Sequence, residues 1–166
     1  MRTHARALAA LVAVALALLP GADGLPEPGD ELRGRWVWPG GVPEVVTPYE
    51  QPAHDYAPGH RGVDVAVRGS EVVAPDDGVV AFRGTVVDRP LITIDHGGGL
   101  VSTLEPVESD LSPGDAVPRG AVVGTLAEGG HTPPGALHLG ARLDGEYINP
   151  LALLGALERP ILLPCC

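Results

Sequence analysis

The sequence has 166 residues and contains no lysine, so all 11 basic residues are arginines. A carrier domain that attaches its prosthetic group to a lysine amine is therefore excluded. Aromatic residues are also scarce, at 4% of the chain. Cysteine is limited to Cys165 and Cys166, which are adjacent at the very end. Neighbouring cysteines cannot clamp distant parts of a fold, and we expect an intermolecular bridge or free thiols instead.

Positive charge is in short supply. The 21 acidic residues outnumber the basic ones and give a formal net charge of −10. Binding to nucleic acid depends on neutralising phosphates with basic side chains, and binding to anionic lipid has a similar requirement. The composition therefore argues against both kinds of partner.

Long apolar runs are also few, and one stands near the start, over residues 7–19. Arg2, His4 and Arg6 precede it and a Pro-Gly pair follows it, which is the three-part pattern of a secretory signal peptide. The run is shorter than the roughly 20 apolar residues that span a bilayer. We predict a signal peptide over residues 1–24, with an uncleaved anchor as the alternative. The mature protein is then exported to the cell envelope or beyond, with no stable membrane insertion.

The rest of the chain is predicted to hold one domain over residues 35–157. A Pro-rich linker over 25–34 precedes it, and a tail over 158–166 follows it. Short β-branched runs are separated by turn sequences such as Asp77-Gly78 and Gly97-Gly98-Gly99. The one segment that looks helical starts at Pro150. This pattern predicts an all-β fold, an antiparallel β-sandwich or open barrel.

Three side chains form a candidate metal site. His60 and Asp64 are an even number of residues apart, so in an extended strand both leave the same face. His138 belongs to a separate predicted strand and reaches that face only through the fold. Two imidazoles and a carboxylate are a frequent catalytic zinc set. The spacing is equally compatible with a loop histidine, a turn-capping aspartate and a histidine packed among leucines.

The sequence resembles the LytM/lysostaphin-type zinc endopeptidases, peptidase family M23. The similar segments occur in the family's order and cover most of the domain: residues 59–86, 92–107, 111–126 and 136–154. The resemblance implies an antiparallel β-fold, one Zn²⁺ and hydrolysis of peptide cross-links in bacterial peptidoglycan. It also implies that His60, Asp64 and His138 are the metal ligands.

Two positions depart from the family pattern. Ala136 stands where the family has the first histidine of His-x-His, and Pro106 stands where another family histidine lies. Neither side chain can transfer a proton, and loss of general acid–base help costs about 10²–10⁴-fold in rate. We hypothesise that His131, in a polar loop shortly before His138, takes over proton transfer. The alternative for His131 is a solvent-exposed loop histidine.

Other candidate residues are less specific. His96 is expected at a hairpin and His54 in a loop, and the tyrosines that could contact substrate are Tyr49, Tyr56 and Tyr147. A catalytically impaired relative that binds cell wall, or regulates another wall hydrolase, is the alternative function. Residues 111–120 also resemble a hairpin of lipoyl and biotinyl carriers, which the absence of lysine excludes. Phosphocarrier domains use paired histidines, but they act in the cytoplasm. The predicted signal peptide therefore argues against that class. The sequence leaves the oligomeric state open.

Overall fold

The computed structural model describes residues 30–54 and 56–157. The predicted signal peptide, the first half of the linker and the tail with both cysteines lie outside the described residues. The described chain begins with a 3-10 turn, η2 (Asp30–Leu32), and the only α-helix in the part described is α2 (Pro150–Leu153). Among these residues, no helix is long and apolar enough to cross a membrane.

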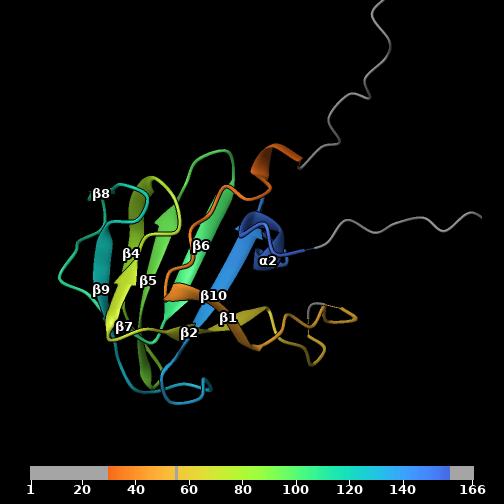
Figure 1. The fold of residues 1–166 in the computed structure, drawn as a ribbon, viewed down its shortest axis with the longest axis horizontal. Helices are drawn as coiled ribbons and strands as arrows, with labels where there is room; N and C mark the ends of the chain where they lie inside the picture. The colour runs from red at the N-terminus through yellow and green to blue at the C-terminus, as the bar shows by residue number, and fades with distance from the viewer. Residues whose placement is uncertain (1–29, 55, 158–166) are drawn as a thin grey trace, which may run out of the picture. The chain divides into compact units, whose positions relative to one another are not determined.

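The strands of the described residues between Leu32 and Leu157 form two antiparallel sheets. The strands are β1 (Gly41–Thr47), β2 (Gly62–Val67), β3 (Glu71–Val73), β4 (Gly78–Val86), β5 (Arg89–Asp95), β6 (Leu100–Glu105), β7 (Val107–Glu108), β8 (Ala116–Val117), β9 (Val122–Leu126), β10 (Ala136–Leu143) and β11 (Glu146–Tyr147). The larger sheet has the order β1-β2-β10-β6-β5-β4-β8, with β11 paired to β10, and the smaller has the order β3-β9-β7. In Figure 1, β10, β6, β5 and β4 run side by side. The all-β prediction is confirmed.

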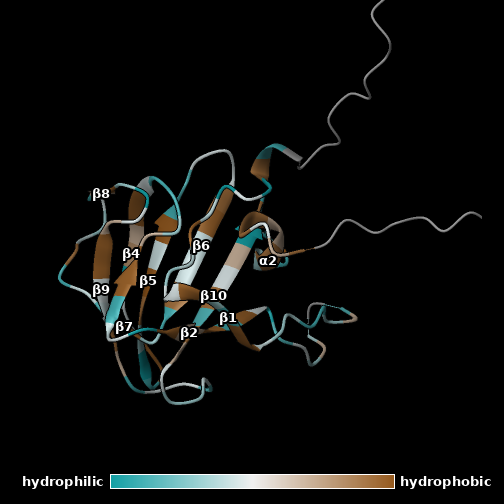
Figure 2. Cartoon of the chain, viewed as in Figure 1, coloured by the Kyte–Doolittle hydropathy of each residue, from teal (hydrophilic) through white to brown (hydrophobic). Residues whose placement is uncertain are grey.

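The core takes one side chain in two from the central strands, as the strand period requires. Leu137 and Leu139 on β10 and Val63 and Val65 on β2 are fully buried in it. The smaller sheet adds Val72, Val107 and Val123 to the same hydrophobic cluster. In Figure 2 the apolar colour lies mostly on the strands, whereas the loops are mostly pale or hydrophilic. The alternate face of β2 and β10 is thereby left free for polar side chains.

Several boundaries differ from the sequence-based expectation. Short runs were expected throughout, whereas β4 is one strand of nine residues, whose pairing with β5 shifts register between Val80 and Phe82. A bulge of this kind keeps a strand continuous while breaking its alternation, which hides it from a period-2 pattern. The predicted helix at Pro150 is present but short. Its N-cap is Asn149, whose Oδ1 accepts from the Leu151 N–H at 3.0 Å.

Candidate metal centre

Strand pairing places Asp64 directly opposite His138. The two residues are register partners of the antiparallel strands β2 and β10. Their strand neighbours Val63, Leu137 and Leu139 are buried in the core. Alternation therefore directs Asp64 and His138 to the other face of the sheet, where the His138 Nδ1 lies 2.9 Å from the Asp64 Oδ1.

His60 approaches the pair from the segment before β2. Its backbone is held by an antiparallel bridge to Glu50, with N–H to carbonyl distances of 2.9 and 3.0 Å. The Nδ1–H of its ring donates to the Pro48 carbonyl at 2.7 Å. That bond fixes the tautomer, because a carbonyl can only accept. The other ring nitrogen, Nε2, faces Asp64 and His138.

The metal triad, by which we mean His60, Asp64 and His138, brings three donor atoms into a small triangle. His60 Nε2 lies 3.1 Å from Asp64 Oδ1 and 3.0 Å from His138 Nδ1. Nitrogen and carboxylate lone pairs at these separations repel each other unless a proton or a cation lies between them. The arrangement therefore suits a shared proton or a cation at its centre.

The donor set fits zinc. Imidazole nitrogens and a carboxylate oxygen bind zinc at about 2.0–2.2 Å, so ligands of a tetrahedral ion lie about 3.3 Å apart. The three separations in the triad are slightly shorter than this value. The Pro48 carbonyl also supplies the outer hydrogen bond that typically orients a metal-binding imidazole. His60, Asp64 and His138 can thus occupy three positions of such an ion.

Burial keeps the triad ready to bind a cation. Asp64 is 2% exposed and His138 is 8% exposed. Burial lowers the pKa of His138 below its usual value, and the hydrogen bond that its ring donates to Asp64 opposes that effect only in part. A neutral imidazole is the form that binds metals. An ionised aspartate held in such a place without a compensating charge would be costly.

His131 stands over the metal triad. It belongs to the His131 loop, residues 128–135, between β9 and β10. Its ring centre lies 5.5 Å from that of His60 and 5.0 Å from that of His138, and its Nε2 lies 3.9 Å from the Asp64 Oδ1. One ligand atom from each of the four residues lies within 4.8 Å of the others. His131 is half exposed, so it faces both the triad and solvent.

The His131 loop rests on the turn between β4 and β5. A Cβ at Gly129 would lie 2.5 Å from the Asp88 carbonyl oxygen, and one at Gly130 would lie 2.4 Å from the Arg89 Cδ. Both glycines also have positive φ values, of 126° and 72°. A larger residue at Gly129 would collide with backbone, whereas at Gly130 the Arg89 side chain would have to move and the positive φ would strain the new residue. This close contact places the loop against the start of β5.

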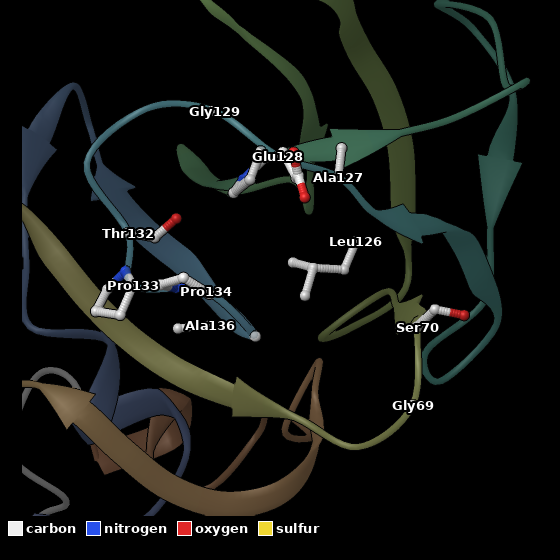
Figure 3. A pocket seen from close by; sticks show the side chains of 12 residues that line it. Gly69, Ser70, Leu126, Ala127, Glu128, Gly129, Thr132, Pro133, Pro134 and Ala136 are labelled. Atoms are coloured by element: carbon white, nitrogen blue, oxygen red, sulfur yellow. The ribbon is translucent and has the colours of Figure 1, made fainter.

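A cavity of about 580 Å³ lies on the side of the loop that carries Thr132 and Glu128. Figure 3 shows it enclosed by the His131 loop, the end of β9 and the turn at Gly69 and Ser70. Ala136 and Pro106 both line it. These are the two positions where the family pattern places histidines, so the missing imidazoles leave open space here.

A second cleft, of about 660 Å³, opens at the triad and is lined by His60, His138 and His131. It contains residues that the sequence analysis did not select. Glu105 is the register partner of His138 on β6 and is 6% exposed. Its Oε2 lies 3.0 Å from the Arg89 Nε, and that hydrogen bond raises the pKa of Arg89. The sequence could not show that Glu105 lies beside His138, because that position depends on the register between β6 and β10.

The remaining candidates fall into two groups. Tyr147 lines the cleft, whereas Tyr56 is 95% exposed in the loop before His60. His96 lies at the β5–β6 hairpin, where it donates to the Asp77 carbonyl at 2.8 Å and is 2.8 Å from the Ser102 hydroxyl. It is not one of the four clustered residues. His54 and Tyr49 also lie outside that cluster.

Comparison with known proteins supplies the family. The model of peptidase family M23 matches residues 58–150, and the chain belongs to this family. That span contains the metal triad, His131 and the cleft. The membership agrees with the resemblance to LytM/lysostaphin-type zinc endopeptidases, from which Ala136 and Pro106 depart.

Individual proteins resemble this chain over two thirds of its length or more. The uncharacterized protein Rv2891 of Mycobacterium tuberculosis is 37% identical over 119 residues, which are 68% of this chain and 48% of that protein. The chain thus spans about half the length of this curated relative. A candidate peptidase M23 from Pseudomonas aeruginosa shares the fold at 24% identity and a TM-score of 0.58, over 95% of this chain and 64% of that one. A zinc-containing peptidase from Vibrio cholerae is 15% identical with a TM-score of 0.58, over 70% of this chain and 38% of that one.

Proposed function

We propose that this protein is an exported zinc-dependent metalloendopeptidase that hydrolyses peptide bonds of bacterial peptidoglycan. The observation that carries the proposal is the convergence of His60 Nε2, Asp64 Oδ1 and His138 Nδ1 in one triangle at the end of an open cleft. Membership of family M23 supports a peptidase. The zinc in a peptidase of the same fold from Vibrio cholerae supports the choice of metal.

In this proposal the metal triad holds the ion and leaves its fourth position for water or substrate. A zinc ion bound there supplies Lewis-acid polarisation of a carbonyl and makes a water molecule more acidic. Asp64 contributes a negative charge, and the Pro48 carbonyl keeps the His60 Nε2 directed at the site. The core packing of β2 and β10 fixes the ligand positions before substrate arrives.

His131 is the side chain placed to move the proton. It comes from a loop, is half exposed, and lies within 5.5 Å of both triad rings, measured between ring centres. A general base must reach the proton that it accepts, directly or through one water. The distances between the His131 ring and the triad rings support that role. His131 thus replaces the imidazole that Ala136 lacks.

Export and the peptidoglycan substrate have separate support. The apolar run at residues 7–19 behind arginines has the form of a signal peptide. The resemblance to LytM/lysostaphin-type enzymes implies cell-wall peptides as the substrate. An acidic chain without lysine fits a partner that is neither nucleic acid nor anionic lipid.

The test is peptide release from purified peptidoglycan. We expect the zinc-loaded protein to release new amino termini, a chelator to stop the release and added zinc to restore it. The control is Asp64→Ala, which removes a ligand that is also the register partner of His138. Equal release by wild type and Asp64→Ala would contradict the proposal, as would no release by the zinc-loaded wild type.

A second function is favoured by one specific observation, the replacement of both auxiliary histidines by Ala136 and Pro106 around an open cavity. In this alternative the protein binds cell-wall peptides, or regulates another hydrolase, without cleaving them. The same assay separates the two functions when binding to peptidoglycan is measured beside release. Zinc-dependent binding without release would support the alternative.

A further inference from the structure

The cleft at the metal triad has a charge that contrasts with the rest of the molecule. The whole chain has a formal charge of −10. The cleft is nevertheless lined by Arg61, Arg89 and Arg142, and among the described residues that line it Glu105 is the only carboxylate. A concentration of one charge in a concave site attracts ligands of the opposite charge. The question is which of these arginines is available to a ligand.

The strand register determines how the residues of the cleft are arranged in rows across the sheet. Asp64, His138 and Glu105 form one row across β2, β10 and β6. The next row on the same face has small side chains at Gly62, Gly140, Thr103 and Thr93. Arg142 follows Gly140 by two residues on β10, so it borders this row on the side away from the triad.

The row of small residues therefore forms the floor of the cleft. The row that holds the triad residues borders it on one side, and Arg142 borders it on the other. Four residues separate His138 from Arg142, a Cα distance of about 13 Å along an extended strand. The arginine side chain covers several ångströms of that distance. A group bound by Arg142 would lie one to two residues from a bond held at the triad, since an extended peptide advances roughly 3.3 Å per residue.

The three arginines differ in their partners. Arg89 is paired with Glu105 at 3.0 Å and with Asp88 at 3.3 Å. Arg142 instead lies over the Tyr147 ring, with its guanidinium carbon 5.7 Å from the ring centre. Within the described part of the chain, no carboxylate forms an ion pair with Arg142.

Tyr147 brings a second guanidinium to the same place. The Arg61 guanidinium carbon lies 5.9 Å from the ring centre. Arg61 has a further contact, because its Nη2 donates to the Ala57 carbonyl at 3.3 Å. A guanidinium binds a carboxylate through two parallel hydrogen bonds, which gives both affinity and orientation.

The opposite wall of the cleft is apolar. Phe82 and Val86 on β4 line it and are 44% and 40% exposed. A peptide in this cleft would therefore meet hydrocarbon on one side and guanidinium groups on the other. Such a site suits a short peptide with small apolar side chains and one free carboxylate.

We propose that Arg142, supported by Tyr147, binds a free carboxylate of the substrate peptide and selects peptides that carry it one or two residues from the cleaved bond. The inference rests on the proposed function, because it assigns the substrate class of the same site. It adds a specificity-determining residue outside the metal triad and the His131 loop.

The experiment compares two cell-wall stem peptides that are identical except that one carboxylate is free or converted to a carboxamide. We expect the zinc-loaded wild type to favour the free acid in kcat/KM by at least about 10-fold, in the range of a charge-assisted hydrogen bond. Arg142→Gln should bring the ratio close to one, mainly through a higher KM for the acid. Arg142→Lys keeps the charge and should restore part of the preference.

The matched control is Arg119→Gln, which removes the same charge from an exposed turn outside the cleft and should keep the wild-type ratio. A wild-type ratio below about two would overturn the inference, as would a ratio unchanged in Arg142→Gln. If neither peptide is hydrolysed, the proposed function fails, and titration calorimetry with the same two peptides decides this inference. An Arg142-dependent preference for the acid in binding would support it, and equal binding would overturn it.

Discussion

At the scale of the residue, one hydrogen bond determines how His60 can act. The Pro48 carbonyl accepts a hydrogen bond from the Nδ1–H, so Nε2 is the ring nitrogen that faces the site. Asp64 Oδ1 and His138 Nδ1 lie 3.1 and 3.0 Å from that atom. The His131 Nε2 lies farther from Asp64, at 3.9 Å, and its side chain is half exposed. The three residues that we propose as ligands are therefore held closer together than the residue that we propose for proton transfer.

The first prediction concerns His131. We expect His131→Ala to lower peptidoglycan turnover by about 10²-fold or more, the usual effect of removing a general acid or base. Zinc content should stay at one ion per chain, because the triad is intact. Turnover and metal content are measured on the same zinc-loaded preparation. Unchanged turnover would remove His131 from the mechanism.

A second substitution sharpens this test. Ala136 lines the open cavity beside β10, so a histidine there has room. If the two imidazoles serve one role, Ala136→His in the His131→Ala background should recover part of the lost turnover. His54→Ala is the matched control, since His54 is exposed and lies outside the cluster.

At the scale of the element, the pairing of β2 with β10 builds the site. Gly62 and Gly140 are register partners one row from Asp64 and His138. A Cβ at Gly62 would lie 2.5 Å from both the His138 Nε2 and the Leu139 carbonyl oxygen. At Gly140 the nearest atom, the Thr103 Cβ, would be 3.6 Å away, an ordinary contact. Only one of these two glycines is required by close packing.

The second prediction uses this difference. We expect Gly62→Ala to destabilise the protein by about 1–3 kcal/mol, the usual cost of overpacking, and to weaken zinc binding by displacing His138. Gly140→Ala should change both quantities little. Thermal unfolding and zinc titration measure the two effects. Equal behaviour of the two variants would show that the approach of Gly62 to His138 is not what positions the ligand.

The third prediction concerns the β5–β6 hairpin and pH. Burial lowers the pKa of His96, although the Asp77 carbonyl, Asp76 and Asp95 oppose this, and Arg35 adds to it. The unfolded chain keeps a histidine pKa near 6.5. As the pH falls below about 6.5, the unfolded chain takes up a proton before the folded chain does. The contribution of His96 to the free energy of unfolding should therefore be complete above that pH and decline below it.

His96→Gln isolates this contribution. The variant should lose the part of the pH dependence between about 6.5 and 5 that belongs to His96, measured as the difference between two sets of urea unfolding curves. His54→Gln, in an exposed loop, serves as the control. A slope in His96→Gln as steep as that of the wild type would show that burial of this imidazole is not linked to folding.

At the scale of the whole molecule, the proposed zinc site links metal binding to stability. The triad joins β2 and β10, which are neighbours in the larger sheet, to the segment before β2. A ligand that binds only the folded chain stabilises it by mass action. Under the proposed function, the zinc concentration therefore affects the unfolding of the domain.

The fourth prediction follows from this linkage. Zinc at 100 times its Kd should stabilise the wild type by about 2.7 kcal/mol, and a chelator should remove that gain. The measurement is the thermal midpoint with and without chelator. Asp64→Ala should unfold at the same temperature in both conditions. A wild-type midpoint that does not respond to chelator would argue against a metal held by the folded triad.

Much of the fold could be predicted because its signals are local. Strand alternation around Val63 and Val65, the three glycines after His96 and the Pro at the start of α2 each depend on a few neighbouring residues. Strands such as β7 and β8, with two residues each, were not predicted, because so short a segment carries no period. The pairing partner rather than the local sequence makes them strands.

The sequence alone determined the all-β class and the residue types of a zinc site, because both follow from side-chain chemistry and period. It could not bring the triad together, since His138 is 74 residues from Asp64 and 78 from His60. The β2–β10 register decided that contact, and the packing of the His131 loop on Arg89 decided that His131 lies above it. The arginine cleft arose in the same way, because strands far apart in the chain share one face only after they pair.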